Sequence, residues 1–155
     1  MGVKVNDNDV SHLQTIDPGI APNAKVAFID IGTNDGALIL PSLSRVLETG
    51  YANVHSASWG NTYNGYGLYS MQFDNYVYYT NDELLPVVAA GNSGKDGSHS
   101  TTEPSNAKNV IAVGSAHSYG NDIQDDMKGP GYVSYFSSQG PTADGRAKPD
   151  IIAPG

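Results

Sequence analysis

The sequence predicts an α/β fold built around a mostly parallel β-sheet. The first observation behind this prediction is the apolar run at residues 84–90, which ends in Gly91 and Asn92. An apolar run of this length that is closed by glycine is typical of a strand buried in a parallel sheet and covered on both faces. The second observation is an expected strand, helix and strand between residues 25 and 59, because this spacing fits a right-handed βαβ unit.

The individual elements follow from the hydrophobic pattern along the chain. Residues 1–18 are polar and are expected to form a loop or a frayed terminus. The expected strands are residues 25–31, 53–59, 84–90 and 109–114, followed by an extended piece at 132–136 and a last short buried piece at Ile151 and Ile152. The expected helices are residues 40–49, with Gly50 as a left-handed stop, and residues 68–80, with Tyr69, Phe73, Tyr76 and Val77 on one face. Neither an internal repeat nor a linker interrupts the series, so residues 1–155 are expected to form a single domain.

Composition and charge narrow the functional classes. Hydrophobic residues make up 39% of the chain and charged residues 15%, which excludes a disordered protein and a coiled coil. The net charge of -8 disfavours nucleic acid and an anionic membrane as partners. The absence of cysteine excludes disulfides and thiolate metal sites. The chain has no apolar run long enough to span a bilayer, and no signal peptide is visible because residues 1–11 are polar.

Asn92 is the first candidate functional residue. It projects an amide donor just beyond the carboxyl end of the expected strand at residues 84–90, where open α/β sheets place their ligands. The alternative is an ordinary turn rich in asparagine and glycine, which is a common way to end a strand. This segment alone does not decide between the two interpretations.

A series of motifs in a fixed order adds weight to the functional interpretation. The motifs are His55-Ser56-Ala57-Ser58-Trp59-Gly60, Ala89-Ala90-Gly91-Asn92-Ser93-Gly94, Asn109-Val110-Ile111-Ala112-Val113-Gly114-Ser115, Phe136-Ser137-Ser138-Gln139-Gly140-Pro141 and Lys148-Pro149-Asp150-Ile151-Ile152-Ala153-Pro154-Gly155. From about Gly19 to Gly155 this series resembles the subtilisin-like serine proteases (subtilases), and most closely large secreted bacterial-type members. The resemblance implies a three-layer subtilisin-like fold with helices on both faces of the sheet, here incomplete, and a secreted or extracellular protein.

The resemblance also implies roles for individual residues. Asn92 matches the oxyanion-hole asparagine of subtilases, and an extended peptide or protein is the implied substrate. Ser58, Trp59 and Gly60 match the edge segment that binds such a substrate as an additional strand. Ala89, Ala90 and Gly91 match the facing wall of the primary specificity pocket. The alternative for these small residues is close packing between layers, and Trp59 is expected to be a partly buried anchor.

The catalytic triad of the family has no counterpart in this sequence. Subtilases carry the aspartate in D-T/S-G, the histidine in H-G-T-H and the serine in G-T-S-M-A, and none of these motifs occurs here. Asp30 follows the Gly-Ile-Ala-Pro-Asn-Ala-Lys segment and therefore lies in the wrong place, His55 matches a structural position, and Ser93 is not the family's nucleophile. We therefore expect a fragment from the middle of a catalytic domain, inactive alone, with the missing parts of its own domain as a partner.

Three further expectations concern ligands and alternatives. The resemblance makes calcium a candidate cofactor, but Asp122, Asp125 and Asp126 show no ligand pattern. Glu103, in a loop near the implied pocket, is a candidate for attracting a basic substrate side chain. The alternative functions are a non-catalytic subtilase-like peptide-binding module and an unrelated flavodoxin-like binding module; the second would place Asn92 away from Ser58.

Overall fold

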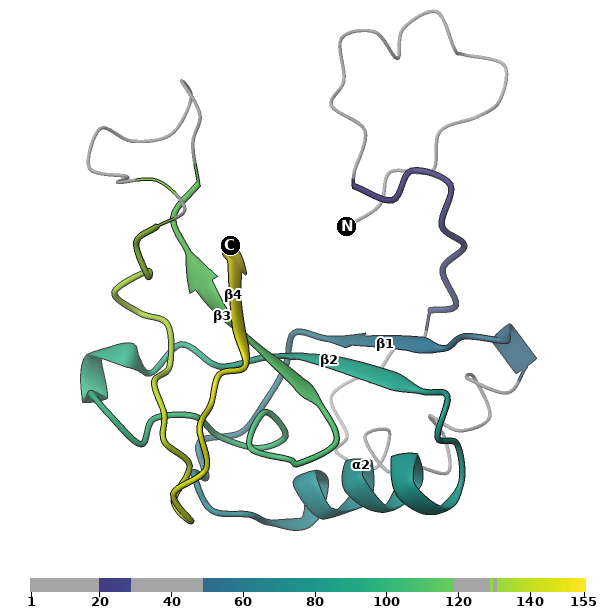
Figure 1. Cartoon of the computed structure of the whole chain (residues 1–155), viewed down its shortest axis with the longest axis horizontal. Coiled ribbons are helices and arrows are strands. Elements are labelled where there is room, and N and C mark those ends of the chain that lie inside the picture. Colours follow the sequence, from purple (N-terminus) through teal and green to yellow (C-terminus); the bar gives the residue numbers. More distant parts are fainter. Residues whose placement is uncertain (1–19, 29–48, 119–128, 130) are drawn as a thin grey trace, which may run out of the picture.

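The computed structural model describes residues 20–28, 49–118, 129 and 131–155. Its elements are the strands β1 (Val54–Ala57), β2 (Leu85–Ala89), β3 (Ile111–Ala116) and β4 (Ile151–Pro154), the helix α2 (Leu68–Tyr79) and the short 3-10 helix η3 (Gly94–Asp96). The strands form one parallel sheet in the order β1-β2-β3-β4 (Figure 1). This arrangement confirms the predicted α/β class, and β1, α2, β2 and β3 each lie within two residues of the predicted bounds.

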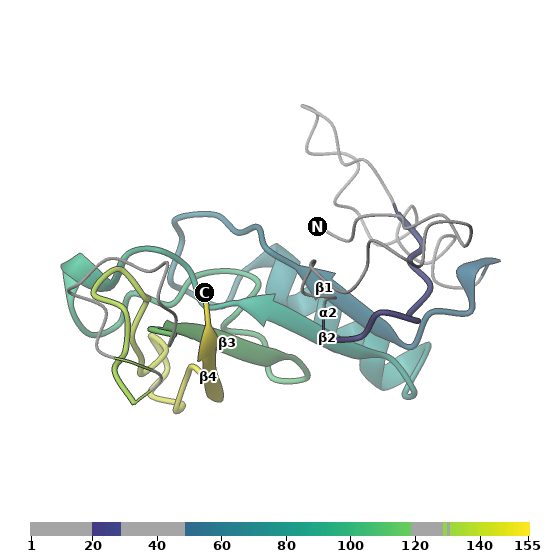
Figure 2. The same cartoon turned by 90° about the horizontal axis from the view of Figure 1, so that it is seen from above.

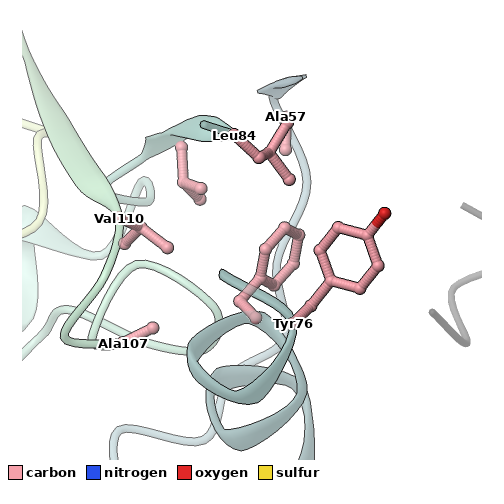
Figure 3. Packing of buried hydrophobic residues seen from close by; sticks show 7 residues of the cluster. Ala57, Tyr76, Leu84, Ala107 and Val110 are labelled. Atoms are coloured by element: carbon pink, nitrogen blue, oxygen red, sulfur yellow. The ribbon is translucent and has the colours of Figure 1, made fainter. Parts of the chain in front are cut away.

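The hydrophobic core lies between α2 and one face of the sheet (Figure 3). Phe73 and Tyr76 are three residues apart and therefore share one side of the helix. They pack in one cluster with Ala57 of β1 and Val88 of β2. Full burial of one such large apolar side chain contributes about 1.5–3 kcal/mol to folding. The core thus fixes α2 beneath β1 and β2, and Figure 2 shows the helix behind these two strands.

Described residues from each connection between consecutive strands pack on the face that α2 covers. Parallel strands that follow one another in a single direction, joined by right-handed crossovers, put their connections on one side of the sheet. Ala107 and Val110, from the connection between β2 and β3, belong to the same core cluster as α2. In the connection between β3 and β4, Ser137 and Pro149 lie against the same side of the sheet at Gly114.

We call the opposite side the open face. Alternation along the strands and the strand register assign to it Val54, Leu85, Val87, Ala89, Ile111, Val113 and Ile151. These apolar side chains are exposed or half-buried. The sequence predicts that the strand at residues 84–90 is covered on both faces, and this prediction is wrong for β2: Pro86 and Val88 are buried, whereas Leu85 is exposed. The physical reason is that the described residues of the connections that pack on the sheet lie on the opposite face.

The last strand also differs from expectation. The sequence predicts a buried piece at Ile151 and Ile152, but their exposed fractions are 53% and 43%. These residues form β4, which stands at the edge of the sheet and pairs only with β3 within the described part of the chain. An edge strand lacks the second neighbour that would bury its side chains.

The predicted strand at residues 25–31 is not formed in its described part. Residues 25–28 are irregular, and Val26 and Phe28 are 80% and 83% exposed. They pair with no strand of the described sheet, and an unpaired extended segment has no hydrogen-bonded ladder to stabilise it.

The predicted left-handed conformation at Gly50 is also wrong, because the positive φ of 49° belongs to Tyr51. Gly50 instead permits a close approach, since a Cβ there would lie 2.8 Å from Ala27 Cβ.

Several predictions fall outside the described residues. They concern residues 1–18, most of the helix at 40–49, Asp30, and the acidic residues Asp122, Asp125 and Asp126.

Candidate substrate-binding site

The two segments singled out in the sequence, residues 58–60 and 89–92, lie at the carboxyl ends of two neighbouring strands. β1 and β2 are parallel neighbours, and Ala57 is aligned with Val88. Ser58 follows the carboxyl end of β1, and Asn92 follows the carboxyl end of β2, so both come from the same edge (Figure 1). Ser58 and Asn92 are exposed. The sheet therefore brings together two segments that are more than 30 residues apart in the chain.

The turn that carries Asn92 is held by a later segment of the chain. Gly91 has a φ of 111°, a left-handed conformation that favours glycine. The N–H of Ser138 donates to the carbonyl oxygen of Gly91 at 3.0 Å, and the N–H of Ser93 donates to Ser138 Oγ at 3.0 Å. The N–H of Gly94 donates to the carbonyl oxygen of Phe136 at 2.8 Å. The backbone on both sides of Asn92 is thus fixed.

Thr102 lies between the two segments. Its Oγ1 would be 3.7 Å from a Cβ atom placed at Gly60, and also 3.7 Å from one placed at Gly91. Thr102 is half-buried and therefore partly accessible. Sequence reasoning missed this residue, because one threonine in a polar loop forms no pattern. The arrangement places a hydroxyl group between the glycines of the two predicted walls.

The edge segment keeps its backbone groups available. Just beyond it, the N–H of Asn61 donates to the carbonyl oxygen of Glu103, and the N–H of Glu103 donates to the carbonyl oxygen of Tyr63, both at 3.1 Å. The loop hydrogen bonds within the described residues use no backbone group of Ser58 or Gly60. Free amide and carbonyl groups along an extended segment are what an added peptide strand requires.

Trp59 is anchored against α2. Its ring packs edge-to-face on Tyr69, with 5.8 Å between centroids, and lies 6.2 Å from the ring of Phe73. The residue is half-buried and contacts the hydrophobic core. Pairs of aromatic rings in such geometries contribute about 0.5–1.5 kcal/mol beyond their buried area. Trp59 therefore anchors the edge segment to α2 and the hydrophobic core.

The three residues of the facing wall lie in different surroundings. Ala90 is buried, donates its N–H to the carbonyl oxygen of Val113 at 2.9 Å and accepts a hydrogen bond from Ser105 Oγ. Ala89 belongs to the open face. Gly91 faces Thr102 and Ser138, because a Cβ there would lie 2.8 Å from Ser138 Oγ. Gly91 is thus the one of the three that adjoins the hydroxyl group of Thr102.

Glu103 is not available to a substrate. Its side chain is only 4% exposed. Its carboxylate accepts hydrogen bonds from Asn61 Nδ2 at 2.8 Å and from the N–H of Ser70 at 3.2 Å. The suggestion that Glu103 attracts a basic substrate side chain is therefore wrong, since the carboxylate is buried and bonded inside the protein.

Two titratable groups that contact α2 have shifted pKa values. Burial lowers the pKa of His55, whose Nε2 is buried without a hydrogen-bond partner and whose ring lies 5.5 Å from that of Phe73. The ring is therefore neutral and structural at pH 7. Desolvation, assisted by the hydrogen bond from Tyr66 to Asp74, raises the pKa of Tyr66 to about 12. Neither group is set up as a general base.

The described residues offer neither a metal cluster nor a membrane-spanning helix. They contain no group of three or more histidine, aspartate or glutamate side chains able to hold an ion. Among the same residues, no helix is long and apolar enough to cross a bilayer.

Comparison with known proteins identifies the family. The model of the subtilase family matches residues 4–155, so this chain belongs to the subtilase family. It is 46% identical over 72 residues to the serine protease AprX of Bacillus subtilis, covering 46% of this chain and 15% of AprX. It is 27% identical over 117 residues to the serine protease/ABC transporter B family protein tagA of Dictyostelium discoideum, covering 66% of this chain and 7% of tagA.

One solved structure is similar to most of this chain. Sphericase is 25% identical with a TM-score of 0.49, and the match covers 77% of this chain and 37% of Sphericase. This chain thus spans a minor part of each of these three proteins. Family membership supports a function of the serine protease type and excludes the unrelated flavodoxin-like module.

Proposed function

We propose that this chain is part of the catalytic domain of a serine endopeptidase that hydrolyses extended peptides through an acyl-enzyme. The observation that carries the proposal is the position of Asn92. It is exposed at the carboxyl end of β2 on a fixed turn, and Thr102 lies between its neighbour Gly91 and Gly60 of the edge segment. An extended peptide paired with that edge would lie beside the amide of Asn92.

Asn92 would act on the charge that develops during catalysis. Attack on a peptide carbonyl places negative charge on its oxygen, and a donor set in advance at that point lowers the barrier by about 2.7–4 kcal/mol. A side-chain amide donates a hydrogen bond without titrating near pH 7. Ser58, Trp59 and Gly60 would hold the substrate as an added strand, while Ala89, Ala90 and Gly91 would form the facing wall of the specificity pocket.

The triad would come from other parts of the same protein. The three triad motifs of subtilases are absent from these 155 residues, so we expect the chain alone to be inactive. The proposed partner of the chain is the remainder of its own catalytic domain, which would cover the apolar open face. We also expect the protein to act outside the cell, as subtilases often do; fractionation of the producing cells and medium would test this.

Two measurements test the proposed activity. A serine-directed fluorophosphonate should not label the 155-residue chain, whereas it should label the product of the complete gene, whose flanking sequence should encode the three triad motifs. In that product, Asn92→Ala should lower kcat by about 100- to 1000-fold with little change in KM. Asn53→Ala, at the opposite end of β1, is the control. Labelling of the isolated chain would contradict the proposal.

The alternative is a non-catalytic peptide-binding module of the subtilase type. The lack of triad motifs in this sequence is the observation that favours it. In that case the complete gene product would bind extended peptides at Ser58–Gly60 but would neither react with the fluorophosphonate nor cleave the peptide. The same two measurements therefore separate the alternatives.

A further inference from the structure

The hydroxyl group of Ser138 lies directly behind the turn that carries Asn92. Ser138 is 2% exposed and 46 positions later in the chain than Asn92. Its backbone N–H donates to the carbonyl oxygen of Gly91, and its Oγ accepts from the N–H of Ser93, each at 3.0 Å. One residue thus bonds both sequence neighbours of Asn92. We propose that Ser138 is a positioning residue that sets the orientation of the Asn92 amide, an inference that rests on the function proposed above.

One of the two hydrogen bonds uses the backbone of Ser138, and the other uses its side chain. The bond to Gly91 involves only the backbone of Ser138, so every residue except proline can make it. The bond from Ser93 requires an acceptor on the side chain. Removing the hydroxyl therefore frees the amide of Ser93, directly after Asn92, while Gly91 stays bonded to Ser138 and Gly94 stays bonded to Phe136. The backbone next to Asn92 would then be less restrained.

Gly91 shows how closely the two segments approach each other. A Cβ atom at Gly91 would lie 2.8 Å from Ser138 Oγ and 3.5 Å from Ser138 Cβ. The turn therefore rests against the Ser138 side chain as well as bonding to it. A small misplacement of a catalytic group is enough to slow a reaction strongly, since about 1 Å can reduce the rate 100-fold.

The adjacent Ser137 provides a matched control. It is also 2% exposed, and its Oγ also accepts a hydrogen bond from a backbone N–H at 3.0 Å. That N–H belongs to Ser115 in β3, and not to the turn of Asn92. Ser137→Ala and Ser138→Ala thus delete the same kind of buried hydrogen bond at neighbouring positions. Only the second deletion affects the candidate site.

The first test is independent of catalysis. Hydrogen exchange of the Ser93 amide should be roughly tenfold faster in Ser138→Ala, because one hydrogen bond is lost. It should be unchanged in Ser137→Ala. If Ser138→Ala fails to fold, Ser138→Cys keeps a weak acceptor and should show a smaller acceleration. Unchanged Ser93 exchange, or equal acceleration in the two alanine variants, would overturn the proposal.

The second test uses the product of the complete gene. Ser138→Ala should lower kcat by about tenfold with KM unchanged, a smaller loss than the roughly 100-fold or more expected when the donor itself is removed. Ser137→Ala should retain kcat. Faster Ser93 exchange with an unchanged kcat would overturn the positioning role alone. A folded gene product without peptidase activity would instead overturn the proposed function and, with it, the catalytic part of this inference.

Discussion

The carboxylate of Glu103 accepts a hydrogen bond from the N–H of Ser70 at 3.2 Å, in the first turn of α2. The helix starts after Gly67, which provides no side-chain cap of its own. A carboxylate at a helix amino terminus satisfies an unpaired N–H and interacts favourably with the helix dipole. The same carboxylate bonds Asn61, which follows the candidate edge segment. Glu103 therefore joins the start of α2 to the residue that follows the candidate edge segment.

Replacing Glu103 should destabilise the fold. Glu103→Ala leaves the N–H of Ser70 and the side-chain amide of Asn61 without their acceptor, and a buried donor without a partner costs about 1–3 kcal/mol. The measurement is the free energy of unfolding in urea. Glu83→Ala, at an exposed position, should change it by less than about 0.5 kcal/mol. Equal effects of the two substitutions would disprove the capping role.

Gly91→Ala should destabilise the protein more than Gly97→Ala. Both glycines have a left-handed φ, 111° and 84°, so both substitutions introduce backbone strain of roughly 1–2 kcal/mol. The Cβ at residue 91 would also press on Ser138 Oγ at 2.8 Å, whereas nothing lies within 4 Å at residue 97. We expect an additional loss of about 1–3 kcal/mol at residue 91. Urea unfolding of both variants measures the difference, and equal losses would show that the turn is not tightly packed.

His55 should make the protein less stable in mild acid. Burial lowers its pKa below the ordinary value of 6.5, so the unfolded chain binds a proton at His55 more readily than the folded chain does. The stability contributed by the neutral ring is fully present above about pH 6.5 and falls as the pH drops below that value. His55→Leu should flatten the dependence of the unfolding free energy between pH 7.5 and about pH 5.

A second histidine serves as the control for this pH dependence. His99 is exposed and has a φ of 63°, a conformation that asparagine tolerates. His99→Asn therefore removes an exposed histidine while the backbone conformation is kept, and it is the matched comparison for His55→Leu. A wild-type slope that survives in His55→Leu would assign the acid sensitivity to other groups.

The open face should cause self-association of the isolated chain. It presents Leu85, Val54 and Ile151 together, and exposed apolar patches of this kind promote association. Leu85→Lys should reduce the fraction of oligomers in analytical ultracentrifugation. Met71→Lys on α2 is the matched control, since Met71 and Leu85 are 41% and 43% exposed. A wild-type chain that stays monomeric at high concentration would count against an interface on this face.

The sequence was sufficient to predict the succession of elements from β1 to β3. The period of the apolar residues distinguishes α2 from the strands, and its buried residues Phe73 and Tyr76 are on the expected face. The pattern could not show which faces of the sheet are covered. That depends on the direction in which successive strands are added, which is a property of the whole chain. Residues 84–90 look doubly buried locally, yet Leu85 is exposed.

The sequence could predict only those residues of the candidate site that stand in a recognisable local pattern. Asn92 at the end of an apolar strand and the small residues near it are visible in the sequence. The roles of Thr102, Ser138 and Glu103 are not, because their contacts join loops that are distant in the chain. Glu103 shows the difficulty most clearly: glutamate is usually exposed, and only the position of Ser70 in space reveals why this one is buried.

The hydrogen bonds behind Asn92 come from Phe136 and Ser138, more than 40 positions later in the chain. During synthesis on the ribosome, β1, α2 and β2 emerge well before these two residues do. A nascent chain can therefore complete the first half of its sheet while the turn of Asn92 is still unrestrained. Restraint of that turn therefore has to wait until residues 136–138 have been synthesised.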